Sequence, residues 1–245
     1  MKKISLFVAF VVISLSAFAQ IGYNYDQYSL GVGISSVKIH GDLHKSYAQA
    51  AYNVNLSYHF TPFVTFSTEA QFGRLSSANI VDTTKTYYGE QSSNKYTAII
   101  FHADVQLGEF INYNDDFSSI PILTKILNGA KNIYIGTGAG VIFNKIDYIN
   151  RQDFVDPNLI IGGLDKSNEL IIPLRIGYEY KIYNGYDEPQ IRIDLGYQAN
   201  FSSGDNMDGF KSGRYNDWYS QITFGIKVGI GGVTSYRKPI HVGAF

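Results

Sequence analysis

The chain has 245 residues, with 20 Lys and Arg against 21 Asp and Glu, which gives a formal net charge of −1. A charge this close to zero gives no electrostatic basis for nucleic-acid binding. The chain has no cysteine, so a disulfide framework and a lipid anchor on cysteine are both excluded. Tyr (20), Phe (16) and Gly (24) are abundant, and such aromatic enrichment favours strands over helices.

The N-terminus has the pattern of a secretory signal peptide. Two lysines precede an apolar stretch over residues 4–15, and Ala17 and Ala19 provide a small-residue cleavage site. A retained membrane anchor is the alternative, although this stretch is short for a spanning helix. We therefore predict a cleaved signal peptide over residues 1–19 and one domain over residues 20–245.

Eight segments alternate between apolar and polar residues with a period of two, which indicates strands with two different faces. The predicted strands cover residues 27–39, 49–60, 63–75, 95–111, 132–146, 170–182, 190–201 and 217–230. The alternation is clearest in the hairpin over residues 170–201, where one face is apolar from end to end. Pro121 and Gly129 frame a predicted short helix over residues 118–128.

Alternation alone does not decide which face meets water. A soluble lipocalin-like barrel has its apolar face inside, whereas a membrane barrel turns that face to lipid. Glycines gather on the polar face, as a narrow lumen requires. Long polar connections over Ser76–Asn94, Asp147–Asn168 and Ser202–Asn216 contrast with short turns at the other end, although connection 112–131 breaks this rule. These features favour the membrane barrel.

Aromatic residues near the strand ends predict two interfacial rings, although aromatics are common in strands generally. One ring includes Tyr28, Tyr58, Phe60, Phe63, Phe110, Tyr113, Tyr180 and Tyr183. The other includes Tyr52, Phe72, Tyr96, Phe143, Tyr148, Phe201 and Trp218.

Over residues 27–230 this pattern resembles the eight-stranded outer-membrane barrels of the OmpA transmembrane-domain and OmpX type. The last predicted strand, DWYSQITFGIKVGIG, is similar to the closing strand that the barrel-assembly machinery recognises. That signal usually ends the chain, whereas fifteen residues follow Ile230 here. The resemblance implies an all-β, closed, antiparallel, up-and-down transmembrane barrel of eight strands in a Gram-negative outer membrane, with residues 231–245 as a periplasmic tail. It further implies contact with outer-membrane lipid, lipopolysaccharide and, during insertion, the barrel-assembly machinery.

Charges of both signs lie on the predicted lumen face. They include Glu69, Asp104, Arg175, Glu179, Arg192, Asp194 and Lys227. Unpaired ions are costly in a confined space, so we expect these residues to pair. Two interpretations stay open, a salt-bridge plug that stiffens the barrel and a gate in a narrow polar pathway.

Candidate catalytic pairs are few. Ser57 and His59 share one polar face, as do His102 and Asp104, but no strained elbow or family motif surrounds them. We therefore expect no enzymatic activity. The loop GDNMDG over residues 204–209 offers oxygen ligands for calcium, with an ordinary turn as the alternative. Its full ligand pattern is absent, so we expect no metal and no cofactor.

Three functions follow from the pattern. The first is a structural or surface-interaction barrel whose long loops contact an extracellular partner that the sequence does not identify. The second is a small pore for ions or small solutes. The third is a soluble periplasmic carrier of an apolar ligand.

Overall fold

The computed structural model describes residues 20–43, 45–80, 88–110, 129–151, 162–186, 188–211 and 216–239. The predicted signal peptide and the predicted helix over residues 118–128 lie outside these residues.

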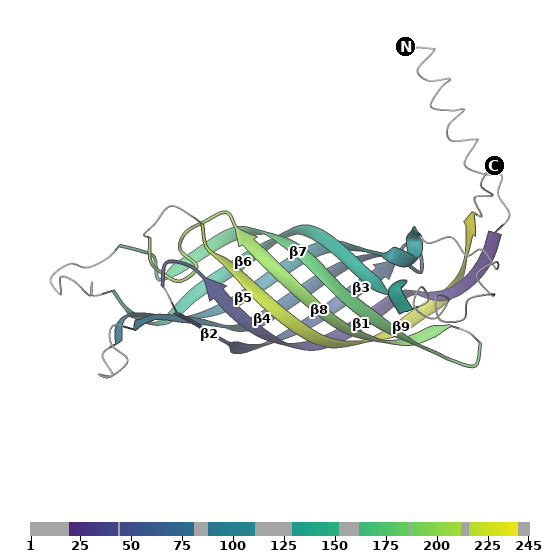
Figure 1. The fold of residues 1–245 in the computed structure, drawn as a ribbon, viewed down its shortest axis with the longest axis horizontal. Coiled ribbons are helices and arrows are strands. Elements are labelled where there is room, and N and C mark those ends of the chain that lie inside the picture. Colours follow the sequence, from purple (N-terminus) through teal and green to yellow (C-terminus); the bar gives the residue numbers. More distant parts are fainter. Residues whose placement is uncertain are drawn as a thin grey trace, which may run out of the picture.

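The described chain folds into a closed barrel of long, tilted antiparallel strands (Figure 1). The strands are β1 (Gln20–His40), β2 (Lys45–Tyr47), β3 (Gln49–His59), β4 (Val64–Ile80), β5 (Tyr88–Gln106), β6 (Ile133–Asn150), β7 (Lys166–Tyr183), β8 (Pro189–Ser202) and β9 (Trp218–Pro239). Hydrogen-bonded neighbours follow the order β4-β3-β1-β9-β8-β7-β6-β5, and β5 pairs again with β4. This ring of eight strands confirms the predicted fold class, and β2 is a short addition beside β4.

The two ends of the barrel differ. The connections β1–β3, β4–β5, β6–β7 and β8–β9 lie at one end, which we call the loop end. The other end, the turn end, carries β3–β4, β5–β6 and β7–β8, and a short 3-10 helix η1 (Leu107–Glu109) follows β5 there. The loop end lies to the left in Figure 1.

Several strands are longer than predicted. β5 begins at Tyr88 and includes polar residues that the sequence pattern assigns to a loop. These residues pair with β4 on one side and β6 on the other, because ladder hydrogen bonds join backbone groups whatever the side chains are. At the turn end, residues 20–26 of β1 pair with residues 233–239 of β9. Part of the predicted tail is therefore strand.

The apolar side chains lie on the outside of the barrel. Val32 is 59% exposed and Leu195 is 56% exposed, whereas Ser57 and Asn94 are fully buried inside. This distribution is the reverse of that in a soluble protein and is typical of a barrel surrounded by lipid. The prediction of a soluble lipocalin-like carrier, which needs apolar faces inside, is therefore wrong.

Among the described residues, no helix has the length and apolarity to cross a membrane.

Most of the described ring aromatics project outward, but two of them do not. Tyr96 is buried in the lumen because it shares its strand face with His102. Phe63 is buried at the turn end, where it lies against Gly108 and beneath the ammonium group of Lys181, 5.1 Å from the ring centroid. Their assignment to the interfacial rings is wrong. Tyr113 lies outside the described residues.

Candidate functional site

Buried ion pairs fill the middle of the barrel around Arg175 on β7. Its Nη1 lies 3.0 Å from Glu69 Oε2 on β4, and its Nε lies 3.3 Å from Asp104 Oδ1 on β5. The His102 ring contacts both carboxylates, at 3.6 Å and 3.2 Å. Gln198 on β8 accepts a further hydrogen bond from Arg175, at 2.9 Å. We call Glu69, His102, Asp104 and Arg175 the central cluster.

The register of β5, β6 and β7 explains how Arg175 reaches Asp104. Gly136 on β6 pairs with Asp104 on one side and with Arg175 on the other. A side chain at Gly136 would overlap with the Asp104 carboxylate. The glycine therefore leaves the space in which two charges on next-nearest strands meet.

A second group of charges lies nearer the turn end. Lys227 Nζ lies 2.9 Å from Glu179 Oε2 and 3.4 Å from Asp194 Oδ2, and Arg192 Nε lies 3.8 Å from Glu179 Oε1. Lys181 donates a hydrogen bond to the side-chain oxygen of Gln106, at 2.7 Å. We call Glu179, Lys181, Arg192, Asp194 and Lys227 the turn-end cluster. The two clusters together contain all seven charged residues predicted for the lumen.

Tyr134 on β6 links the two clusters. Its hydroxyl donates a hydrogen bond of 2.9 Å to Asp194, and its ring centroid lies 5.9 Å from the Arg175 guanidinium carbon. Side chains at Gly177 or Gly196 would overlap with its hydroxyl. Sequence reasoning missed Tyr134. The sequence does place Tyr134 on the glycine-rich face of β6, which indicates the lumen. Its position beside Gly177 and Gly196 could not be predicted, because it depends on the pairing of these two glycines across β7 and β8.

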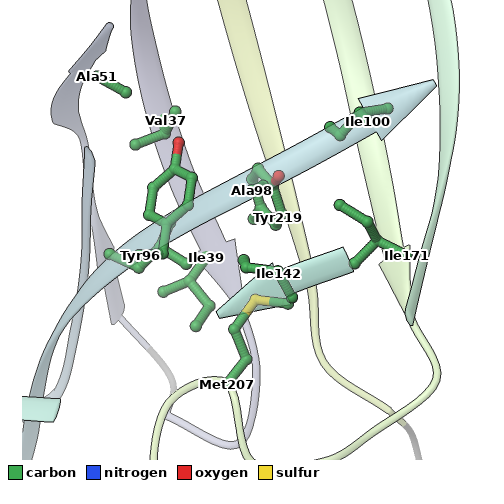
Figure 2. Close-up of a cluster of buried hydrophobic side chains, with 11 residues drawn as sticks. Val37, Ile39, Ala51, Tyr96, Ala98, Ile100, Ile142, Ile171, Met207 and Tyr219 are labelled. Atoms are coloured by element: carbon green, nitrogen blue, oxygen red, sulfur yellow. The ribbon is translucent and has the colours of Figure 1, made fainter. Parts of the chain in front are cut away.

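The loop-end half of the lumen contains an apolar cluster among buried polar side chains such as Gln71, Asn94 and Asn144. Its buried cluster consists of Val37, Ile39, Ala51, Leu75, Tyr96, Ala98, Ile100, Ile142, Ile171, Met207 and Tyr219. Most of these side chains project inward from the strands, whereas Met207 enters from the β8–β9 connection (Figure 2). Sequence reasoning missed this cluster because it treated the whole interior as polar.

The described part of the β8–β9 connection folds across the mouth of the barrel. Asn94 on β5 donates a hydrogen bond of 2.7 Å to the carbonyl oxygen of Met207. Arg151, after β6, donates to the carbonyl oxygen of Gly209 at 3.2 Å. Met207 and Phe210 are almost completely buried, at 0% and 1% exposure. The connection therefore covers the apolar cluster from the loop end.

Two buried carboxyl groups hold this connection in shape. Asp217 Oδ2 accepts a hydrogen bond of 2.8 Å from the Met207 amide, and Asp208 Oδ2 accepts one of 3.1 Å from the Asp42 amide. A side chain at Gly41 would overlap with both carboxyl groups, so both point toward that glycine. Among the described residues, no group of three or more His, Cys, Asp or Glu could hold a metal ion.

These two aspartates make the connection sensitive to pH. Burial raises the pKa of Asp208 to about 7 and that of Asp217 to about 8, and the nearby Asp208 charge adds to the shift at Asp217. An unfolded aspartate releases its proton near pH 4. Between about pH 4 and pH 8 the folded connection binds more protons than the unfolded one, so its stability falls as the pH rises through this range.

The candidate catalytic pairs do not form a nucleophile with its base. His59 Nε2 lies 2.9 Å from Ser29 Oγ and its Nδ1 lies 2.8 Å from Thr65 Oγ1. Ser57 instead pairs with Ser67, at 2.8 Å. His102 and Asp104 belong to the central cluster described above.

The sequence matches no protein-family model, and no curated protein matches it significantly. Three solved structures are similar in fold at low identity. Neisserial surface protein A is 12% identical, with a TM-score of 0.45, and the match covers 83% of this chain and 97% of that protein.

The attachment invasion locus protein Ail of Yersinia pestis is 11% identical, with a TM-score of 0.42 and coverage of 86% and 99%. The outer membrane protein OprG of Pseudomonas aeruginosa is 11% identical, with a TM-score of 0.39 and coverage of 85% and 99%. Barrel closure here rests on the strand pairing of this chain itself. In fold, the chain is similar to small eight-stranded outer-membrane β-barrels.

Proposed function

We propose that this chain is a non-enzymatic outer-membrane barrel with a closed lumen, which presents its loop end to an extracellular partner. The observation that carries the proposal is the filling of the interior. The apolar cluster under Met207, the central cluster and the turn-end cluster follow one another along the barrel. A narrow barrel whose interior is filled by its own side chains is a rigid support for its loops.

The ion pairs support a structural role over a gating role. The Arg175, Glu69 and Asp104 side chains are each less than 10% exposed. Separating one partner from such a group leaves a buried charge unpaired and lowers the stability of the barrel by about 3–5 kcal/mol. A gate would have to separate these ion pairs each time it opened, whereas in a plug that stiffens the barrel the ion pairs stay formed.

The exposed apolar belt and the predicted signal peptide support a location in the outer membrane. Both described ends of the barrel, Gln20 and Pro239, lie at the turn end. Long loops face outward and short turns face the periplasm in outer-membrane barrels, so the turn end is periplasmic. Lipid and lipopolysaccharide then surround the belt, and the barrel-assembly machinery inserts the chain.

Planar-bilayer recording tests the closed lumen. We expect the purified, folded wild-type protein to give no steady conductance steps at neutral pH, and Arg175→Gln to give none either while it remains folded. The mobility difference between unheated and boiled samples on gels reports folding of each preparation. Steady steps from the wild type, with size or ion selectivity altered by Arg175→Gln, would show a pore through the central cluster.

Cell fractionation tests the location separately. We expect the mature protein in the outer-membrane fraction, extractable only with detergent. Recovery of folded protein by osmotic shock without detergent would contradict the proposal.

A further inference from the structure

Four cationic residues form a row on the lipid-facing side of the barrel near its loop end. Arg74 on β4 pairs directly with Lys95 on β5, Lys95 pairs with Lys145 on β6, and Lys145 pairs with Lys166 on β7. All four side chains are exposed and lie on the outward face. Neighbouring strands are about 4.8 Å apart, so the row spans roughly 15 Å. We call these four residues the cationic row.

The charges of the cationic row are poorly compensated within the barrel. Like charges directly opposite each other on neighbouring strands repel. Asp147 compensates part of this charge, with Oδ1 2.8 Å from Lys95 Nζ and Oδ2 3.5 Å from Arg74 Nη2. Within the described ranges, Lys145 and Lys166 form no ion pair with a carboxylate. An anion with several charges would therefore relieve repulsion along the row.

The cationic row begins where the apolar belt ends. Arg74 and Lys145 each follow an exposed phenylalanine, Phe72 and Phe143, by one outward position on the same strand. This depth corresponds to the headgroups of the leaflet on the loop-end side.

The cationic row occupies one flank of the barrel, over β4 to β7. On the other flank, the outward residues that follow Ile34, Tyr52 and Ile222 toward the loop end are Ser36, Ala50 and Ser220. Lys38 is exposed one outward position beyond Ser36, but its partner on β9 is Ser220, so it has no cation directly opposite it. Lys38 therefore serves as a matched surface lysine outside the row.

We propose that the cationic row binds the phosphate groups of a phosphorylated glycolipid in the outer leaflet. The proposal rests on the outer-membrane location inferred above. The lipid anchors its phosphates at the depth of the row, Arg74 supplies a planar guanidinium that binds phosphate oxygens in pairs, and the lysines supply point charges. Two or more phosphates on one headgroup match a row of this length better than a single ion does.

Lipid titration tests the site. Folded protein in a neutral detergent is titrated with bisphosphorylated lipid A, and native mass spectrometry measures the bound fraction. We expect Lys145→Ala with Lys166→Ala to weaken binding about 25-fold, or roughly fivefold for each lysine, because each basic residue near an anionic membrane surface contributes that much. We expect Lys38→Ala to leave binding within about twofold of wild type.

Comparison with other ligands tests whether the phosphate groups of the lipid are what the row binds. Dephosphorylated lipid A should bind equally weakly to the wild type and the double variant, and 10 mM inorganic phosphate should not displace the lipid. Equal binding of both lipids, or no difference between the double variant and Lys38→Ala, would overturn the proposal. Selective binding of a soluble sulfated glycan to the row, without binding of lipid A, would also overturn it in favour of an extracellular polyanion.

Insertion into plain phosphatidylcholine vesicles separates the proposed phosphate site from the proposed membrane location on which it rests. Failure to insert would refute the membrane location itself. Insertion of the wild type and both variants, combined with no preference for phosphorylated lipid, would refute only the phosphate site.

Discussion

Replacing Arg175 with methionine tests the central cluster most directly. The substitution removes the cation that contacts Glu69 Oε2 at 3.0 Å and Asp104 Oδ1 at 3.3 Å, but keeps a side chain of moderate length. Both carboxylates then remain buried without a cation of fixed charge, with the His102 ring beside them and the Gln71 amide donating to Glu69. Because stranded buried charges are costly, we expect the free energy of unfolding to fall by about 3–5 kcal/mol.

A neutral triple variant gives the matched control for this prediction. Combining Arg175→Met with Glu69→Gln and Asp104→Asn removes every formal charge of the salt bridges, and we expect it to recover most of the loss. Arg74→Met removes an arginine whose side chain is 53% exposed and should cost no more than about 1 kcal/mol.

Urea unfolding in lipid vesicles measures these differences through the fluorescence of Trp218, the only tryptophan of the chain. Its ring stacks on His40 and Phe201 and so reports contact among β1, β8 and β9. A loss below about 1 kcal/mol for Arg175→Met would refute the reasoning, as would a triple variant no more stable than the single one.

Three further predictions concern the lipid face and the loop end. Leu195→Arg, near the middle of the apolar belt, should destabilise the barrel in vesicles by about 2–4 kcal/mol. Ser36→Arg, near the loop-end interface, should destabilise it by at most about 1 kcal/mol. Equal losses of stability would contradict the assignment of the lipid-facing side. Met207→Ala should destabilise the folded β8–β9 connection by about 2–5 kcal/mol. Amide hydrogen exchange should then become faster in this connection and stay unchanged in the strands. Unaltered exchange would contradict the packing of Met207 in the apolar cluster. The protection of this connection from hydrogen exchange, corrected for intrinsic rates, should fall between about pH 5 and pH 8.5, because burial raises the pKa values of Asp208 and Asp217. Asp217→Asn should weaken this pH dependence. Protection of the wild type that does not change with pH would contradict the prediction.

Local alternation was enough to predict the strands and their two faces. Arg175, Glu179, Arg192 and Asp194 all lie on the lumen side, as the period of two requires. The same rule should have placed Tyr96 inside, since it lies an even number of residues from His102, but its aromatic ring favoured an interfacial assignment. Strand ends were harder to predict because pairing beyond the belt needs no apolar side chains.

Contacts between distant segments could not be read from the pattern. Met207 belongs to a buried cluster with residues from several strands, and nothing in the sequence GDNMDG indicates that its methionine turns inward. The cationic row depends on the register between four strands, which are joined by connections of different lengths. Sequence alone fixes the face of each lysine but not the residue opposite it.

The pairing of β1 with β9 closes the barrel by joining its first and last strands. All other neighbours in the ring are close in sequence, whereas this pair joins residues as far apart as Gln20 and Pro239. Bringing such distant segments together costs chain entropy, and contacts of this kind slow folding. Hairpins can form early and separately, but the edges of β1 and β9 stay unpaired until they meet. Unpaired strand edges can pair with other chains, so the closure of β1 on β9 also protects the barrel from aggregation.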